Sequence, residues 1–260
     1  MMPFLTLEHL GRTAIVTMNH PPANLLTAES LQALSAQLSI LQGDKSVRAL
    51  VLTGAGETYF SAGLSLVMLA AGEQAPAEGL IDLLSGVCRQ LREFHGVTVA
   101  AVNGVALGAG LECALSCNFV IAERGAILGM PQARVGLIPG AGGIKLLADK
   151  VGQAWTRRMV LAGETLDAER AYQVGLIEEV VDGGFAKIVA VSLADKVARQ
   201  GPEATALAQS LIDAAPLLSF DEHLRQARHG YLQLIGGEEQ RLGVAAFLDK
   251  RSPPWCEDED

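Results

Sequence analysis

The stretch Gly104–Glu112, which reads GVALGAGLE, places three glycines and an acid directly after the apolar run Val97–Val102. Glycine lets the backbone turn sharply and lets another group approach it closely. The pattern indicates a buried strand, a glycine turn and a helix start with free backbone N–H groups. Such a turn can stabilise an anion, for example the enolate formed from a thioester. The alternative is that the glycines only allow a strand and a helix to pack closely.

Glu112 has two interpretations in this setting. An acid in the first turn of a helix complements the helix dipole, and this is common without any catalytic role. A carboxylate beside an anion-binding turn can also act as a general base or acid, if its pKa is raised or if it holds a water. The neighbouring residues alone leave both interpretations open.

Other catalytic patterns do not fit the chain. Gly108 and Gly110 begin a dinucleotide fingerprint, but Cys113 stands where the third glycine belongs. The run Gly136–Lys145 lacks the Gly-Lys-Ser/Thr of a P-loop, and no serine has G-x-S-x-G surroundings. The spacing of the cysteines fits no zinc site; they are Cys88, Cys113, Cys117 and Cys256. Hydride transfer, nucleotide hydrolysis and a serine triad therefore have little support.

The composition describes a protein with a large core. Of the 260 residues, 50% are hydrophobic and 19% are charged, which suits one large domain or a domain with an appendage. The formal net charge of −9, without a basic cluster, argues against nucleic acid as a partner. No apolar stretch reaches membrane-spanning length, and the N-terminus lacks signal-peptide features. Together with cysteines expected to be reduced, these features predict a cytoplasmic protein.

The elements that must position these residues follow from hydrophobic periodicity. Strands are predicted at Leu5–Leu10, Thr13–Met18, Ala49–Leu52, Val97–Val102, Phe119–Ala122, Ala126–Gly129 and Ile177–Val181. Helices are predicted between them at Ala28–Gln42, Gly79–Phe94, near Gly108, and at Ile144–Lys150, Gln153–Leu161, Ala168–Tyr172 and Ala186–Arg199. Only helices follow, at Pro202–Ala214, Ser219–Leu234 and Glu238–Lys250. This order predicts an α/β core at 1–200 and a helical C-terminal region at 201–260.

Three motifs, in order along the chain, resemble the crotonase family of enoyl-CoA hydratases and isomerases. They are RALVLTGAGETYFSAGLSL at 48–66, the glycine-rich run from Ala100 to Gly143, and AAFLDKRSPP at 245–254. The resemblance implies a crotonase-like spiral of ββα units, with a helical C-terminal region that forms a trimer or a dimer of trimers. It implies an acyl-CoA substrate, as in fatty acid metabolism. It also implies no metal or separate cofactor, because coenzyme A is part of the substrate.

The resemblance also assigns roles to individual residues. It places the two backbone N–H groups of an oxyanion hole on Leu64 and Ala109. Glu112 falls on the first of two glutamates that hydratases use to hold and activate water, which favours the catalytic interpretation. At the coenzyme A end, the resemblance implies contacts from Ala62 and Leu64, and from two further residues. These are Tyr231 near the adenine and Lys250 near the nucleotide phosphates, which suit a stacking ring and an amine.

Two positions depart from the family pattern. Gln132 follows Pro131 where the family has its second glutamate. Glutamine can hold a water by hydrogen bonds, but it cannot give or take a proton at neutral pH. In hydratases the second glutamate protonates the α-carbon, and in many isomerases it is the sole base. Ser65 replaces the usual aspartate, which we interpret as a local change in loop bonding.

The resulting prediction is hydration of a 2-trans-enoyl-CoA, with Glu112 as the only retained catalytic acid and Gln132 orienting the water. Decarboxylation of a malonyl-type thioester and enoyl-CoA isomerisation are alternatives within the family. A catalytically weak or inactive acyl-CoA-binding trimer is a third. The acyl pocket is expected to involve Gly79–Phe94 and Leu64–Ala71, including Met68, but the sequence does not identify the acyl chain.

Overall fold

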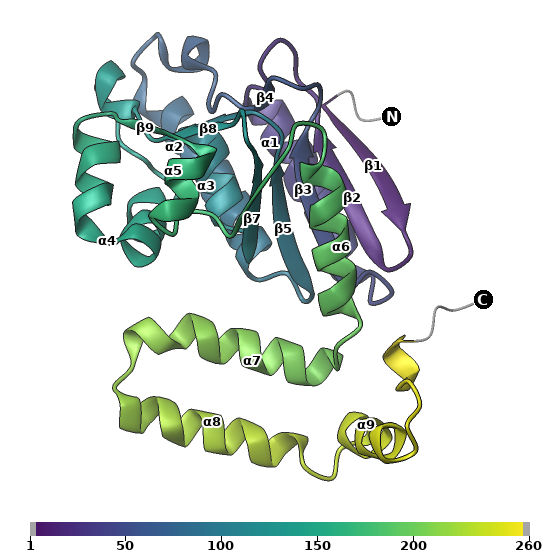
Figure 1. The fold of residues 1–260 in the computed structure, drawn as a ribbon. Coiled ribbons are helices and arrows are strands. Elements are labelled where there is room, and N and C mark those ends of the chain that lie inside the picture. Colours follow the sequence, from purple (N-terminus) through teal and green to yellow (C-terminus); the bar gives the residue numbers. More distant parts are fainter. Residues whose placement is uncertain (1–3, 257–260) are drawn as a thin grey trace. The chain divides into compact units, whose positions relative to one another are not determined.

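The computed structural model describes residues 4–256. The chain divides into two compact units, residues 1–194 and residues 195–260 (Figure 1). The first unit contains all the strands of the described chain, and the described part of the second, 195–256, contains helices but no strand.

The first unit repeats a strand–strand–helix order four times. The repeats are β1 (Leu5–Leu10), β2 (Thr13–Met18) and α1 (Ala28–Gly43); β3 (Ala49–Gly54), β4 (Tyr59–Ser61) and α2 (Gln74–Arg92); β5 (Val97–Val102), β6 (Val105–Leu107) and α3 (Ala109–Leu115); and β7 (Phe119–Glu123), β8 (Ile127–Gly129) and α4 (Gly143–Leu161). After them come β9 (Thr165–Asp167), α5 (Ala168–Gln173), β10 (Glu179–Val181) and α6 (Ala186–Ala198). Short 3₁₀ helices, η1 (Leu66–Leu69) and η2 (Gln132–Val135), follow β4 and β8.

The strands form two sheets, and this arrangement makes the repeats a spiral. The larger sheet has the order β1-β2-β3-β5-β7-β10, and the smaller has β4-β6-β8-β9. From the second repeat on, the first strand of each repeat pairs in parallel in the larger sheet, and the second strand does so in the smaller. Each repeat is therefore one turn of the spiral, stacked on the previous one (Figure 1). This confirms the spiral fold that the family resemblance implied.

Burial explains why these segments form these elements. Every residue of β3 and of β5 is buried, as expected for central parallel strands covered on both faces. Helix α1 buries four leucines at helical spacing, which is the pattern that predicted it; they are Leu31, Leu34, Leu38 and Leu41. The apolar residues whose spacing predicted these elements are thus the residues that face the core of the first unit.

The structure corrects several predicted boundaries. Helix α2 begins at Gln74 rather than Gly79, because Pro76 is tolerated in a first turn, where N–H groups have no helical partner. Helix α4 runs through both helices predicted around Gly152, with a kink at that glycine. Strands β4, β6 and β9, of three residues each, were not predicted, since such short segments show no measurable periodicity. Strand β10 begins at Glu179, two residues later than predicted.

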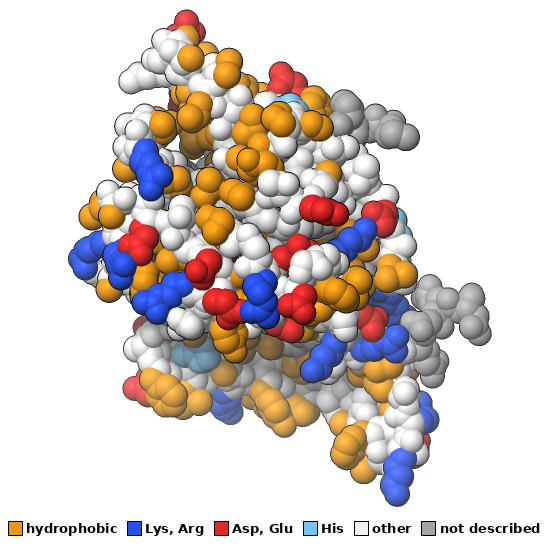
Figure 2. Space-filling model, turned by 45° about the horizontal axis from the view of Figure 1, so that its top comes forward, with side chains coloured by type: hydrophobic (Ala, Val, Ile, Leu, Met, Phe, Trp, Pro, Cys, Tyr) orange, Lys and Arg blue, Asp and Glu red, His pale blue; other side chains and the backbone are white. Residues whose placement is uncertain are grey.

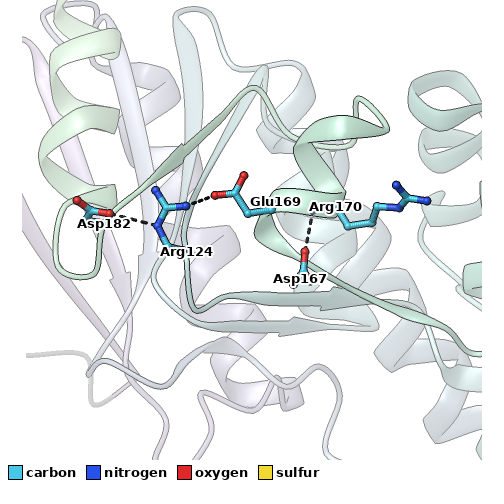
Figure 3. A network of polar contacts seen from close by, with 5 residues as sticks. All are labelled: Arg124, Asp167, Glu169, Arg170 and Asp182. Atoms are coloured by element: carbon cyan, nitrogen blue, oxygen red, sulfur yellow. Dashed lines mark hydrogen bonds and ion pairs between the residues drawn. The ribbon is translucent and has the colours of Figure 1, made fainter.

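An exposed polar network joins three late elements of the first unit (Figure 3). Arg124, which follows β7, forms ion pairs with Glu169 of α5 and with Asp182, which follows β10. Asp167 caps α5 by accepting a hydrogen bond from the backbone N–H of Arg170 at 2.7 Å. The network therefore fixes α5 against the edge of the larger sheet at the surface.

The second unit contains α7 (Pro202–Ala214), η3 (Ala215–Leu217), α8 (Phe220–Leu234), α9 (Glu238–Leu248) and η4 (Pro254–Cys256). These helices confirm the three that were predicted. Ser219 and Glu222 form a capping box at the start of α8. No helix among residues 4–256 is long and apolar enough to cross a membrane.

Candidate active site

Three strand ends meet along the smaller sheet. Because β4, β6 and β8 are parallel neighbours, the turns that follow them lie next to one another. These turns contain 62–64, 108–109 and 130–132. The second and third turns are joined by a hydrogen bond of 2.9 Å from the N–H of Gly108 to the carbonyl of Gly129. Carboxyl ends of parallel strands are the usual place for a ligand in α/β proteins.

The first two turns touch at Gly63. Its φ of +93° favours glycine, and a Cβ placed there would lie 2.7 Å from the carbonyl oxygen of Leu107. The same Cβ would lie 3.3 Å from the backbone nitrogen of Ala109. Only glycine therefore lets the turn after β4 lie directly against the start of α3.

Two backbone N–H groups at this contact have no acceptor in the described part of the chain. Around Leu64, the carbonyl of Gly63 and the N–H of Ser65 both bond to Leu26, at 2.9 and 3.0 Å. The N–H of Leu64 itself takes no part in this pairing. Ala109 is the first residue of α3, so its N–H has no partner within the helix. These are the two donors that the resemblance singled out.

Glu112 is buried, with 1% of its surface exposed. Its Oε1 accepts hydrogen bonds from the N–H groups of Ala141, at 2.7 Å, and Gly143, at 3.0 Å. Gly143 is the first residue of α4 and Ala141 lies in the turn just before it, whereas the glutamate belongs to α3. Gly143 leaves room for this contact, because a Cβ there would lie 2.7 Å from Glu112 Cγ. Glu112 therefore caps a neighbouring helix rather than its own.

The surroundings of Glu112 raise its pKa. Burial away from water is the largest cause, and it outweighs the opposing hydrogen bonds from the backbone amides of Ala141, Gly143 and Gly140. A carboxyl group with a raised pKa binds a proton more readily than an exposed one and can accept a proton and return it. The group is thus suited to acid–base chemistry as well as to helix capping.

Gln132, the first residue of η2, lies across from Gly108. A Cβ on Gly108 would lie 3.3 Å from Gln132 Nε2. The Oε1 atom of Gln132 is buried and has no hydrogen-bond partner among the described residues. A buried carbonyl without a donor is costly and uncommon, so this atom is suited to accept a hydrogen bond from a ligand or a water.

These residues line one cavity of about 410 Å³. Among the residues of 4–256 that line it, the side chains able to carry charge are Glu112 and Arg134, and Gln132 adds an amide. The other lining residues are glycine or apolar: Ala62, Gly63, Leu64, Leu66, Leu69, Ala77, Ile81, Leu107, Gly108, Ala109, Pro131, Val135, Leu137, Ile138 and Gly140. A mostly apolar cavity with a few convergent polar groups is typical of a small-molecule site.

A family model described as enoyl-CoA hydratase/isomerase matches residues 11–258. The chain belongs to the enoyl-CoA hydratase/isomerase family. An Escherichia coli protein named 2,3-dehydroadipyl-CoA hydratase is 35% identical over 98% of this chain and 99% of its own. A Clostridium acetobutylicum protein named short-chain-enoyl-CoA hydratase is 30% identical over 94% of each chain.

Solved structures agree with this membership. Pseudomonas aeruginosa DspI has a TM-score of 0.93 at 44% identity, covering 97% of this chain and 96% of its own. An enoyl-CoA hydratase from Bacillus anthracis has a TM-score of 0.93 at 28% identity, covering 98% of this chain and 100% of its own. The crotonase-type fold therefore extends over the whole described chain.

The structure brings most of the residues expected from the family pattern together. Five of them line the one cavity, namely Ala62, Leu64, Ala109, Glu112 and Gln132. The other two belong to the second unit. Tyr231 is 66% exposed on α8, and Lys250 follows α9 with a positive φ. The roles of all seven in catalysis or binding stay predictions.

Sequence reasoning missed the residues that hold Glu112. Ala141 and Gly143 donate from the run GAGG at 140–143, which was tested as a phosphate loop and forms the end of a family motif, but was not linked to Glu112. Of the expected acyl-pocket segments, Leu69 and Ile81 do line the cavity, whereas Met68 is not among its lining residues. Arg134 also lines the cavity and was not predicted.

Proposed function

We propose that this protein hydrates a 2-trans-enoyl thioester of coenzyme A. The observation that carries the proposal is a buried carboxyl group of raised pKa, Glu112, in the same cavity as two amide N–H groups without acceptors. The relatives named 2,3-dehydroadipyl-CoA hydratase and short-chain-enoyl-CoA hydratase, matched over nearly their full length, support it. Coenzyme A enters as part of the substrate, and the proposed reaction calls on no separate cofactor.

In the first step, the thioester oxygen accepts hydrogen bonds from the N–H groups of Leu64 and Ala109. A water held by Glu112 attacks C3 of the enoyl group, and the carboxylate takes up the proton that the water loses. The C2–C3 π electrons move toward C1, and the carbonyl oxygen receives the negative charge of the enolate. One donor of this kind typically contributes about 2.7–4 kcal/mol of transition-state stabilisation.

In the second step, C2 must receive a proton, and Gln132 has none to give at neutral pH. The buried Oε1 of Gln132 accepts a hydrogen bond from the water and so orients it between the carboxylate and the substrate. The proton then returns to C2 from Glu112 through water, which restores the carboxylate. Since a lost acid–base group costs a factor of about 10²–10⁴, the reaction is expected to be slower than with two acids.

Decarboxylation of a malonyl-type thioester is the second candidate, and Gln132 is the observation that favours it. Departure of CO₂ generates the enolate without a base, so that one acid is enough to guide protonation of C2. Glu112 and the two backbone donors would serve this reaction equally well. Isomerisation has less support, because the position of Gln132 lacks a base.

The proposal extends to the nucleotide end of the substrate and to assembly. Tyr231 would stack on the adenine and Lys250 would pair with the phosphates, reaching the substrate from a neighbouring subunit of a homotrimer or a dimer of trimers. We place the enzyme in the cytoplasm.

The test is turnover by the purified full chain. With crotonyl-CoA, we expect loss of the ultraviolet band of the enoyl thioester and formation of 3-hydroxybutyryl-CoA. Release of labelled CO₂ from a malonyl-type thioester, without hydration of crotonyl-CoA, would instead support the decarboxylase. Binding of both thioesters without turnover of either would contradict any catalytic role and leave an acyl-CoA-binding protein.

A further inference from the structure

One side of the cavity presents large apolar side chains to solvent. Val135, Leu137 and Ile138 line the cavity and are 53%, 40% and 72% exposed. Figure 2 shows hydrophobic side chains gathered around a hollow in the upper part of this face. Clustered exposed apolar groups on the wall of a cavity indicate a site for an apolar ligand, which would remove them from water.

Helix α2 also lines the cavity, through Ala77 and Ile81, and η1 lines it through Leu69. Ile81 lies against the backbone of Gly140, where a Cβ would meet Ile81 Cδ1 at 3.0 Å. Gly140 directly precedes Ala141, whose N–H holds Glu112. The Ile81 side chain therefore lines the cavity next to the loop that positions the acid.

The charges around the cavity argue against an acyl chain that ends in a charged group. Arg134 is the cation of the cavity lining, but its Nη2 donates to the carbonyl of Gly163 at 2.7 Å. Gly163 lies in the turn between α4 and β9 and is not among the lining residues, so the guanidinium is directed toward that turn. A carboxylate at the end of an acyl chain would therefore meet the apolar wall without a partner, which is unfavourable.

We propose that the acyl chain of the substrate is uncharged, aliphatic and longer than four carbons, that it lies between Ile81 and the 135–138 segment, and that Ile81 sets its length. This inference rests on the proposed function, because it names the substrate class of the same site. Ile81 is here a specificity-determining residue and takes no part in proton transfer.

A chain-length series tests the first part. The wild-type protein is assayed with the trans-2-enoyl-CoA thioesters of four, eight and twelve carbons. Each buried methylene is expected to improve kcat/KM by up to about fourfold, so that the eight-carbon substrate exceeds crotonyl-CoA by about tenfold or more. Hydration of crotonyl-CoA with no gain for longer chains would overturn this inference and leave the proposed hydratase intact. No hydration of any chain length would contradict the proposed function itself.

Two substitutions at Ile81 test its role. Ile81→Phe places a larger side chain in the cavity and should lower kcat/KM for the eight-carbon substrate by about tenfold relative to crotonyl-CoA. Ile81→Ala enlarges the cavity and should raise kcat/KM for the twelve-carbon substrate relative to kcat/KM for the eight-carbon one. The matched control is Ile40→Phe, at an exposed position of α1 outside the cavity, which should leave these ratios unchanged. Equal losses for all chain lengths in both Ile81 variants would mean that Ile81 only supports the loop at Gly140, and would overturn its assignment.

A pair of six-carbon substrates tests whether the end of the acyl chain is uncharged. Trans-2-hexenoyl-CoA and 2,3-dehydroadipyl-CoA have the same chain length and differ by a terminal carboxylate. We expect the uncharged thioester to be preferred by about tenfold or more. A preference for the dicarboxylic thioester that Arg134→Gln abolishes would overturn the inference and assign the carboxylate to Arg134.

Discussion

The surroundings of Glu112 and of Arg124 show two ways in which this molecule uses polar contacts. Glu112 is almost fully buried, and backbone amides of a neighbouring helix start hold its carboxylate. Arg124 lies at the surface, 58% exposed, and its partners Glu169 and Asp182 are also side chains in contact with water (Figure 3). Both sets of contacts join elements that are distant in sequence.

The difference between the two regions is the cost of losing water. Around Glu112 burial disfavours the charged form, so the pKa of the carboxyl group is raised and it binds a proton more readily. Around Arg124 water screens the charges, and the ion pairs contribute little to stability. Burial, rather than the number of polar contacts, therefore distinguishes a group suited to chemistry from exposed ion pairs that only connect surface elements.

The largest expected effect comes from Glu112→Gln. The amide keeps an oxygen for the N–H groups of Ala141 and Gly143, so the fold is expected to be retained. Without a proton acceptor, hydration of crotonyl-CoA should fall by about 10³-fold or more. The control is Glu178→Gln, at an acid outside the cavity lining, which should keep the wild-type rate. A Glu112→Gln variant with more than about a tenth of wild-type turnover would leave Glu112 as a helix cap only.

The pH dependence of stability sharpens the same comparison. Since burial raises the pKa of Glu112 in the folded state above its ordinary value of 4.5, the unfolded chain ionises first as pH rises. The contribution of Glu112 to stability is therefore complete below pH 4.5 and is lost as pH rises through the folded pKa. In thermal unfolding at a series of pH values, the melting temperature of the Glu112→Gln variant should rise relative to that of the wild type as pH increases above 4.5. A constant difference across this range would contradict a raised pKa.

A gain of function is expected next, from Gln132→Glu. A second carboxyl group in the cavity can protonate C2 directly, and crotonyl-CoA hydration should rise by about 10–10²-fold. Gln90→Glu is the matched control, because Gln90 also has a buried Oε1 without a partner but does not line the cavity. An unchanged rate in Gln132→Glu, with retained folding by circular dichroism, would mean that Gln132 does not contact the reacting water.

The sequence predicted the long elements well, because leucines at helical spacing in α1 and apolar runs in β3 and β5 report burial directly. It did not predict β4 or β6, although their carboxyl ends carry the two free amides. Such short strands exist because they pair with neighbours far along the chain, and this pairing leaves no local periodicity. The glycines of Gly104–Glu112 indicated the turn after β6, whereas only the family resemblance identified the turn after β4.

Glu112 shows the same limit at the level of one side chain. From the sequence it was either a helix cap or a catalyst, and the cap was assigned to its own helix. The structure shows that it caps α4, through amides 29 and 31 residues away. A contact over that separation depends on how the turns of the spiral stack, which local pattern does not encode. The cap and the acid are therefore compatible, because the amides that cap α4 also hold the carboxylate in the cavity.

The smallest expected effect comes from Arg124→Gln, which removes both ion pairs of the exposed network. Because exposed ion pairs typically contribute about 0–1 kcal/mol each, the melting temperature should fall by no more than about 4 °C. Hydration of crotonyl-CoA should stay at the wild-type rate, since Arg124 does not line the cavity. Lys145→Gln, which removes the exposed pair with Asp149, gives the scale for an ordinary surface pair. A loss of turnover in Arg124→Gln, but not in Lys145→Gln, would mean that the position of α5 affects the geometry of the cavity. The exposed network would then contribute to catalysis, contrary to the comparison made above.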